Sequence, residues 1–426
     1  MDLQKILRDL ENCPCGKTHT FATKAVEIES GLLSRAGNVL ANAGFPKNIL
    51  LVSDGPAFRA ADGILDSLAA AGFTVKQLIF DEMIYARVEQ VREIEALLAD
   101  VDGVLAVGTG SVNDICRVAS HECNKAFAIF ATAPSMDGFA SDTAPIIENN
   151  FKSSWVAEQP SVILADTKIL AKAPVALKAA GFGDMIAKYI GILDWRIANL
   201  LIDEYYCPAV AEITMQGLRR VVALADRVAT EDEEAAGSIM EGLILSGLGM
   251  KLATSSRPAS GAEHVVSHYW ECHKLADGVW PGYHGTKVGV ASLLITRIYR
   301  NIAERVECVH PIPDPTNWDE VFAAYDPSQH ADLKKLNTPT ITDRVDPARL
   351  AEIWPKVREL ILTILPPAEE MERMMRAAGA AITPDDAHVS AELVEKGLRY
   401  HSYMRYRILL TRLLPMLQLD IMEFLK

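Results

Sequence analysis

Three of the four histidines between Ser255 and Gly289 have a spacing that can serve a metal site. His264 and His268 are four residues apart, so on a helix they lie on the same face, with Cβ atoms about 5–6 Å apart. His284 follows in the glycine-flanked turn GYHGTKVG, far enough along the chain for a second helix to fold back beside the first. Three imidazoles can therefore converge, and imidazole is a common metal ligand. The alternative is that these rings only fill a helical core.

A second candidate site is a glycine turn, GTGSVND at residues 108–114, where a buried strand is expected to run into a helix. Gly108 and Gly110 allow a ligand to approach the backbone, and the free N–H groups at a helix start can bind phosphate. The turn suits a pyrophosphate, although the third glycine of the GxGxxG fingerprint is absent. Asp54, at the end of an earlier strand, can bind ribose hydroxyls, or it can cap the helix that follows.

A polar loop of small residues, ATAPSMDGFASDTAPI at 131–146, follows another buried strand. In a doubly wound sheet, loops at the carboxyl ends of strands carry ligand contacts. Asp137, Ser141 and Asp142 are therefore candidates for binding, with simple turn formation as the alternative.

The elements that must position these residues alternate in the first part of the chain. Apolar strand patterns alternate with helical patterns from residue 48 to about 170, which predicts a mostly parallel sheet with covering helices. From about residue 171 nearly all patterns are helical. We therefore predict an α/β, Rossmann-like nucleotide-binding domain at 1–170, followed by an all-α metal- and substrate-binding domain at 171–426. The apolar end, LLTRLLPMLQLDIMEFL, should dock on the domain core or on a partner subunit.

Composition limits the function classes. The chain has 426 residues, half of them apolar, and a formal net charge of −14, so it should be a globular enzyme for small molecules without a nucleic-acid surface. It contains no apolar run or leader pattern for membrane insertion or secretion, so we expect it in the cytoplasm.

The seven cysteines are mostly dispersed, as expected for reduced thiols. Cys13-Pro-Cys15, with His19 four residues later, can either grip a metal or form a simple turn. A second CxxC-like half for such a site is missing from the sequence.

Five motifs in this order resemble the superfamily of iron-containing alcohol dehydrogenases, glycerol dehydrogenase and 3-dehydroquinate synthase. They are GTGSVND, TAPSMDGFAS, GFGDMIAKY, SSRPASGAEHVVSHYWE and GYHGTKVG. Within this superfamily, SRPASGAEHVVSHYWE resembles the sn-glycerol-1-phosphate dehydrogenase family, and the CPCGKTH start resembles the bacterial branch of that family. The resemblance covers roughly residues 25–300. It implies a dehydroquinate synthase-like fold, with the active site in the cleft between the two domains, and a homo-oligomer, a dimer or larger.

The resemblance also implies site residues. Asp184, His264 and His284 match the family's ligands for one divalent metal ion, with Zn²⁺ or Ni²⁺ as the candidates. His268 and Asp137 match catalytic and substrate-contacting positions, and Asp184 lies beside the substrate as well. Matches to contacts of the cofactor, NAD(H) or NADP(H), are Asp54, Gly110, Ser111, Val112, Asn113, Asp114, Thr132, Ala133, Pro134, Ser135 and Ser141.

The implied reaction is the NAD(P)H-dependent reduction of dihydroxyacetone phosphate to sn-glycerol 1-phosphate, and its reverse, by metal-assisted hydride transfer. The substrate's phosphate needs a cation, and Arg257 is the candidate because its guanidinium fork matches phosphate oxygens. The alternative for Arg257 is a surface or inter-helix salt bridge. Rival functions are a glycerol dehydrogenase for the unphosphorylated polyol, a 3-dehydroquinate synthase-like lyase, and a catalytically dead scaffold.

The nucleotide assignment predicts the effect of a bulky residue at Gly110. In Gly110→Val the side chain would occupy the space that the pyrophosphate must enter, so nucleotide binding should be abolished while metal content stays intact. Fluorescence titration with NADH checks this, and an unchanged affinity would rule out the placement.

Overall fold

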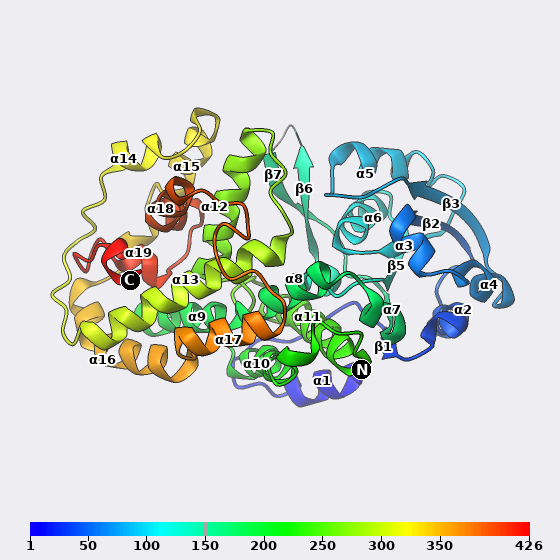
Figure 1. Cartoon of the computed structure of the whole chain (residues 1–426), viewed down its shortest axis with the longest axis horizontal. Coiled ribbons are helices and arrows are strands. Elements are labelled where there is room, and N and C mark those ends of the chain that lie inside the picture. Colours follow the sequence, from blue (N-terminus) through cyan, green and yellow to red (C-terminus); the bar gives the residue numbers. More distant parts are fainter. Residues whose placement is uncertain (149–150) are drawn as a thin grey trace.

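The computed structural model describes residues 1–148 and 151–426 as two halves side by side (Figure 1). One half is built on a parallel sheet and the other is helical, so the predicted fold class is confirmed. The strands are β1 Ala25–Glu29, β2 Asn48–Asp54, β3 Thr74–Phe80, β4 Gly103–Gly108, β5 Ala126–Ala131, β6 Thr143–Glu148, β7 Phe151–Val156 and β8 Val162–Asp166.

The main sheet has the strand order β1-β8-β5-β4-β2-β3, and every pair in it is parallel. Its central strands are continuous apolar runs because helices cover both faces. Leu50 and Val52 of β2 pack on the side of α5 (Val88–Glu95) and α6 (Gly110–Glu122), whereas Ile49 and Leu51 face α2 (Ala36–Asn42) and α4 (Ile64–Ala70). The chain turns back between β2 and β4, since β3 lies on the outer side of β2. That reversal creates the crevice in which such sheets bind ligands.

The α-helices of the sheet half are α2 Ala36–Asn42, α3 Gly55–Ala60, α4 Ile64–Ala70, α5 Val88–Glu95 and α6 Gly110–Glu122. Those that follow the sheet are α7 Thr167–Lys172, α8 Val175–Ile186, α9 Lys188–Ile202, α10 Pro208–Val222, α11 Glu233–Ala253, α12 Ala262–Ala276, α13 His284–Arg305, α14 Trp318–Ala323, α15 His330–Leu336, α16 Pro347–Ile364, α17 Ala368–Ala377, α18 Ala391–Tyr400 and α19 Leu410–Leu413. Each strand predicted from an apolar run is present.

The β6–β7 hairpin was not predicted. Its first strand, TAPIIE, lies at the end of a stretch that we interpreted as a loop, because proline and small polar residues dominate there. The hairpin is antiparallel, with Thr143 opposite Val156, and it forms a sheet of its own. β6 packs on α6 and β7 packs on α12, so the hairpin connects the two halves. In Figure 1 it stands between them.

Both ends of the chain dock on the helical half. α1 (Leu3–Leu10) lies beside α10 and α11 (Figure 1), where Leu10 packs with residues of both helices. At the other end, Leu413 and Phe424 are buried in the core formed with α12, α13 and α16. Of the two alternatives for the apolar end, docking on the domain core therefore holds.

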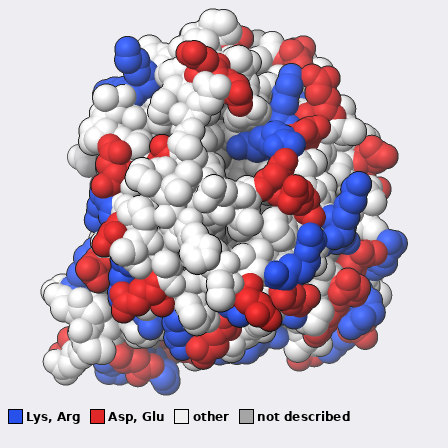
Figure 2. All heavy atoms as spheres, turned by 90° about the vertical axis from the view of Figure 1, so that its left-hand side faces the viewer, with Lys and Arg blue, Asp and Glu red and all other residues white. Residues whose placement is uncertain are grey.

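The outer face of the helical half carries acidic and basic side chains in a mixed pattern around a broad uncharged area (Figure 2). Charged side chains of this half also pair along single helices, as Lys396 does with Glu392 and Arg399 with Glu395. Within the described ranges, no helix combines the length and the apolar character that a membrane crossing requires.

Helices α8 and α13 touch backbone to backbone, and this contact positions two candidate metal ligands. A Cβ atom at Gly285 would lie 1.9 Å from the carbonyl oxygen of Ala180, and one at Gly183 would lie 2.4 Å from the carbonyl oxygen of Gly285. Only glycine permits this approach. Asp184 follows Gly183 in α8 and His284 precedes Gly285 in α13, so the same contact brings both side chains to one place.

Replacing Gly285 should therefore affect stability and metal binding together. Gly285→Ala forces α8 and α13 apart, and such overpacking costs about 1–3 kcal/mol of unfolding free energy. Denaturant unfolding and metal analysis check this. Gly237→Ala in α11 is the control, because the nearest atom to its new Cβ is a side-chain methyl of Thr167 at 3.1 Å. Equal stability of both variants would contradict the role of the contact.

Candidate active site

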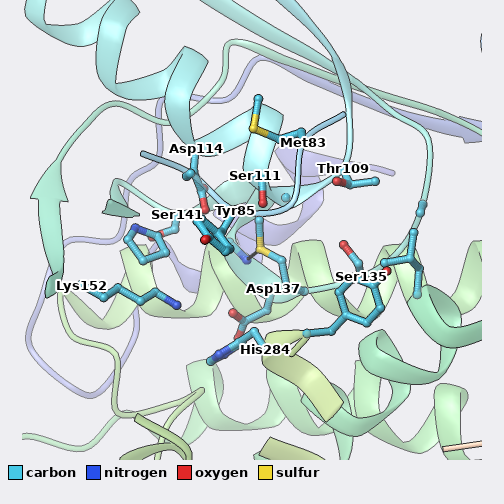
Figure 3. Close-up of a pocket in the computed structure, with 18 of the residues that line it drawn as sticks. Met83, Tyr85, Thr109, Ser111, Asp114, Ser135, Asp137, Ser141, Lys152 and His284 are labelled. Carbon is cyan, nitrogen blue, oxygen red and sulfur yellow. Dashed lines mark hydrogen bonds between the residues drawn. The ribbon is translucent and has the colours of Figure 1, made fainter. Parts of the chain in front are cut away.

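One cavity of about 1080 Å³ extends from the carboxyl ends of the strands to helices α12 and α13. Asp54 and Thr109 line it on the sheet side, and His264, His268 and His284 line it on the helical side. Figure 3 shows side chains from both halves pointing into this space. The nucleotide end and the imidazole end predicted from separate motifs thus belong to one site.

At the nucleotide end the glycine turn has the predicted form. Thr109 is the N-cap of α6 but makes no side-chain capping hydrogen bond, so the first N–H groups of the helix are available to an anion. Gly110 lies at the cavity wall, and a Cβ atom there would come within 2.6 Å of the Met136 side chain. A larger residue at this position would have to displace the Met136 side chain.

The predicted cofactor residues fall into two groups. Those that line the cavity are Asp54, Gly110, Ser111, Asp114, Thr132, Ala133, Ser135 and Ser141. Val112, Asn113 and Pro134 do not line it, and their cofactor contacts stay predictions. Val112 is buried in the core beneath α6, and the Asn113 side chain donates to Asp114. The carbonyl of Pro134 faces α8 at Gly181.

Asp54 caps a helix, one of the two alternatives that the sequence left open, and its contact with ribose hydroxyls stays a prediction. Its Oδ1 accepts a hydrogen bond from the backbone N–H of Ala57, so it caps α3. The residue also lines the cavity. Burial raises the pKa of Asp54, although the Ala57 N–H opposes the shift.

At the other end Asp184, His264 and His284 converge. Their ligand atoms all lie within 4.8 Å of one another, and His264 Nε2 is 3.4 Å from Asp184 Oδ1. Asp184 is fully buried and the other two side chains line the cavity. One carboxylate and two imidazoles with one open side form a donor set that a catalytic divalent ion requires.

Two residues that the sequence analysis missed hold this cluster in place. Glu263 Oε1 accepts from Nδ1 of His264 at 2.7 Å, which leaves Nε2 facing Asp184. Lys188 is completely buried and donates to Asp184 Oδ1 at 2.9 Å and to Asp137 Oδ2 at 2.7 Å. A carboxylate behind a ligating histidine is a common second partner at metal sites. The sequence did contain a signal for Lys188, because a lysine four residues after Asp184 lies on the same face of a helix and can pair with that carboxylate.

The protonation states fit cation binding. Burial lowers the pKa of His284 to about 3, so its ring is neutral and has a lone pair to offer. Burial alone would raise the pKa of Asp184, but Lys188 and the nearby imidazoles hold it well below its usual range. Burial likewise opposes the charged form of His264, yet hydrogen bonds with Asp184 and Glu263 raise its pKa to about 9. A bound cation would replace the Nε2 proton of that ring.

The charge balance also fits a divalent ion. Lys188 pairs with Asp137 and Asp184, and Glu263 pairs with His264. Once an ion displaces the extra proton of His264, the three buried carboxyl groups would be balanced by the ammonium group of Lys188 and by that ion. Unbalanced buried charge is costly. In addition, Nδ1 of His284 is buried without a hydrogen-bond partner in the described part of the chain. The residues present therefore suit a divalent metal.

His268 and Asp137 lie beside this cluster. The His268 ring is 6.1 Å from that of His264 and 5.7 Å from that of His284, between ring centres, so the three imidazoles do converge. Burial and the charge of Arg405 hold the pKa of His268 well below its usual range. Asp137 accepts from Ser246 at 2.9 Å as well as from Lys188, and Figure 3 shows it next to His284. Both residues line the cavity, whereas Asp184 does not.

Arg257 is placed differently from its prediction. It does not line the cavity, and its guanidinium donates from Nε and Nη2 to both carboxylate oxygens of Glu204. Its Nη1 donates to the carbonyl of Ile408 at 2.7 Å. These contacts engage all three guanidinium nitrogens, so they do not support the predicted phosphate contact of Arg257. They agree with the alternative of an inter-helix salt bridge, here between the segments that follow α9 and α11.

Three other cations line the cavity near the imidazoles, and the sequence analysis named none of them. Lys152 extends from β7 toward the cavity (Figure 3) and pairs with Glu271 at 3.0 Å. Arg407 donates to Ser260 O and Ser256 Oγ, and burial together with Arg257 and Arg405 lowers its pKa to about 9. Among the described residues, no carboxylate lies within ion-pair distance of Arg405 or Arg407.

Comparison with known proteins agrees with this site. The family model for iron-containing alcohol dehydrogenase matches residues 27–174. A glycerol-1-phosphate dehydrogenase [NAD(P)+] from Halalkalibacterium halodurans is 35% identical over 313 residues, which cover 71% of this chain and 77% of that protein. One from Geobacillus stearothermophilus is 31% identical over 408 residues, or 93% of each chain. The chain belongs to the glycerol-1-phosphate dehydrogenase family.

The resemblance predicted from the five motifs is thereby confirmed. The family fold extends to solved structures of low identity. A probable glycerol dehydrogenase from Sinorhizobium meliloti 1021 superposes with a TM-score of 0.62 at 15% identity, covering 96% of this chain and 99% of that one. At that identity the likeness supports the fold alone.

The ligand assignment in this family member predicts that His284→Ala loses the ion held by the cluster. Two donors remain, and Asp184 then has no neutral imidazole of α13 beside it. Metal analysis by mass spectrometry and turnover measurements check this. His310→Ala is the control, because His310 is exposed and lies outside the cluster. Full metal content and turnover in His284→Ala would overturn the assignment.

Proposed function

We propose that the chain catalyses the NAD(P)H-dependent reduction of dihydroxyacetone phosphate to sn-glycerol 1-phosphate, and its reverse. The relatives that share 31–35% of its sequence carry that activity in their name. The observation that carries the proposal is one cavity that combines a nucleotide cradle, a metal donor set and unpaired cations.

The cations favour a phosphorylated substrate. Arg405 and Arg407 line the cavity near His268, and Arg405 makes no side-chain hydrogen bond with the described residues. A phosphate group could accept charge-assisted hydrogen bonds from these two guanidinium groups. An unphosphorylated polyol offers no such charge, which argues for the phosphate ester over the glycerol dehydrogenase alternative.

Asp184, His264 and His284 would hold the divalent ion. When bound, such an ion supplies Lewis acidity to the oxygen of the ketone or alcohol. A nicotinamide cofactor bound through its pyrophosphate at the glycine turn would supply or accept the hydride. Zn²⁺ and Ni²⁺ both suit nitrogen and oxygen donors, and metal supply in the cell selects between them.

The chain's own residues then orient the substrate. His268 is neutral, so it can donate a hydrogen bond to a substrate hydroxyl without adding charge. Asp137 is fixed by Lys188 and Ser246 through Oδ2, which leaves its other oxygen to accept from a substrate hydroxyl. Because Asp137 is held by the buried partners Lys188 and Ser246, the substrate meets a preorganised acceptor.

Asp54 bears on the choice of cofactor. Its carboxyl group at the end of β2 can accept hydrogen bonds from both hydroxyls of the adenosine ribose. It would repel the 2′-phosphate of NADPH, so we expect NADH to be preferred. The homo-oligomer suggested by the family resemblance stays a prediction.

An activity assay tests the proposed function. Metal-stripped protein reloaded with Zn²⁺ or Ni²⁺ should reduce dihydroxyacetone phosphate with NADH, and the stripped protein should not. Dihydroxyacetone without phosphate should be a poor substrate. Preference for dihydroxyacetone would instead favour a glycerol dehydrogenase, and no turnover of either ketone would contradict both functions.

Arg405→Leu should weaken the use of dihydroxyacetone phosphate selectively. A charge-assisted hydrogen bond to phosphate contributes about 1.5–3 kcal/mol, so kcat/KM should fall roughly 10- to 150-fold. The value for unphosphorylated dihydroxyacetone should change far less. Arg373→Leu is the matched control, since Arg373 is exposed on α17. Equal losses on both ketones would show that Arg405 acts through the structure and not through the phosphate.

A further inference from the structure

A second group of metal-ligating side chains lies outside the active site. Cys13, Cys15, His19 and Cys207 place their ligand atoms within 4.8 Å of one another. The group shares no residue with the catalytic cavity. The sequence analysis found the first three residues but no second half. Folding supplies the fourth donor from Cys207, 188 residues after His19.

We propose that these four residues bind one structural Zn²⁺ ion. Three thiolates and one imidazole form a closed tetrahedral set, the pattern of structural zinc sites, with no position left for substrate. Tetrahedral zinc with its usual bond lengths places its donors about 3.6–3.8 Å apart. Here Cys13 Sγ is 3.4 Å from Cys207 Sγ, while His19 Nε2 is 3.1 Å from Cys15 Sγ and 3.8 Å from Cys207 Sγ.

The surrounding groups orient the donors as zinc requires. Nδ1 of His19 donates to the carbonyl of Leu252 at 2.9 Å, so the lone pair of Nε2 faces the sulfur atoms. The Tyr205 hydroxyl donates to Cys15 Sγ at 3.3 Å, and the Val210 N–H donates to Cys207 Sγ at 3.5 Å. Both contacts stabilise a thiolate.

Cys207 is also the N-cap of α10, a helix of 15 residues. The positive end of its dipole favours a thiolate at this position. Cys207 is fully buried and His19 is 7% exposed, so the two donors are shielded from water. Three thiols that bind zinc release their protons to solvent, which couples binding to folding.

The ion would join three distant parts of the chain. It would tie the turn after α1 to the start of α10 and, through His19, to the end of α11. The apolar cluster between these elements is small, so a metal would add stability where the core is thin. Leu252, which receives the His19 hydrogen bond, lies two residues before Thr254 in the wall of the catalytic cavity. Loss of zinc should therefore loosen that wall.

Cobalt spectroscopy separates this site from the catalytic one. Protein expressed in cobalt-supplemented medium should show an intense thiolate-to-metal charge-transfer band in the near ultraviolet, because only this site offers sulfur donors. The band should persist in His284→Ala, which removes a catalytic ligand, and in Cys308→Ser, whose thiol is exposed and remote. It should disappear in Cys207→Ser. Failure of the catalytic assignment would leave these results unchanged.

Absence of the band in the wild-type protein would overturn the proposal, even if Cys207→Ser failed to fold. A Cys13–Cys207 disulfide detected by mass spectrometry of unreduced wild-type protein would also overturn it. For protein expressed with zinc, Cys15→Ser should lose one equivalent of zinc and unfold at a lower temperature, whereas Cys308→Ser should retain both properties. Full zinc content in Cys15→Ser would count against the site.

Discussion

The backbone contact between α8 and α13 is the constraint on which the catalytic end of the molecule depends. Gly183 and Gly285 leave no room for a side chain between the helices, and this brings Asp184 and His284 together. Two helices with ordinary side chains pack about 8–10 Å apart, and glycine at the contact permits a closer approach. Glycine at these positions thus contributes to chemistry rather than to flexibility.

Close packing also forces charged groups into the interior, where each needs a partner. Lys188 bonds to both Asp137 and Asp184, and Glu263 bonds to His264, so the second layer of the site is itself ionic. Such networks hold their members in one geometry because breaking any one pair leaves an unsatisfied buried charge. The substrate-facing residue Asp137 and the metal ligand Asp184 are therefore fixed by the same ammonium group.

The cavity is assembled from parts that are far apart along the chain. β2, β4 and β5 supply the nucleotide end, α12 and α13 the imidazoles, the hairpin supplies Lys152, and the segment after α18 supplies Arg405 and Arg407. Because α11 packs on both the sheet and the helices, the nucleotide end and the imidazole end of the cavity are held in a fixed position relative to each other. Hydride transfer requires this, since donor and acceptor carbons must be held at near contact.

The sequence by itself determined the parallel sheet, the helical half and the glycine turn, because periodicity and short motifs are local properties. Its resemblance to the family supplied the ligand candidates Asp184, His264 and His284. Tertiary structure decided what each charge does. Arg257 and Arg405 look equivalent in the sequence, yet folding pairs the first with Glu204 and leaves the second at the cavity. It also brought Cys207 to Cys13, Cys15 and His19. Residues so far apart along the chain form no short sequence motif, because only folding brings them together.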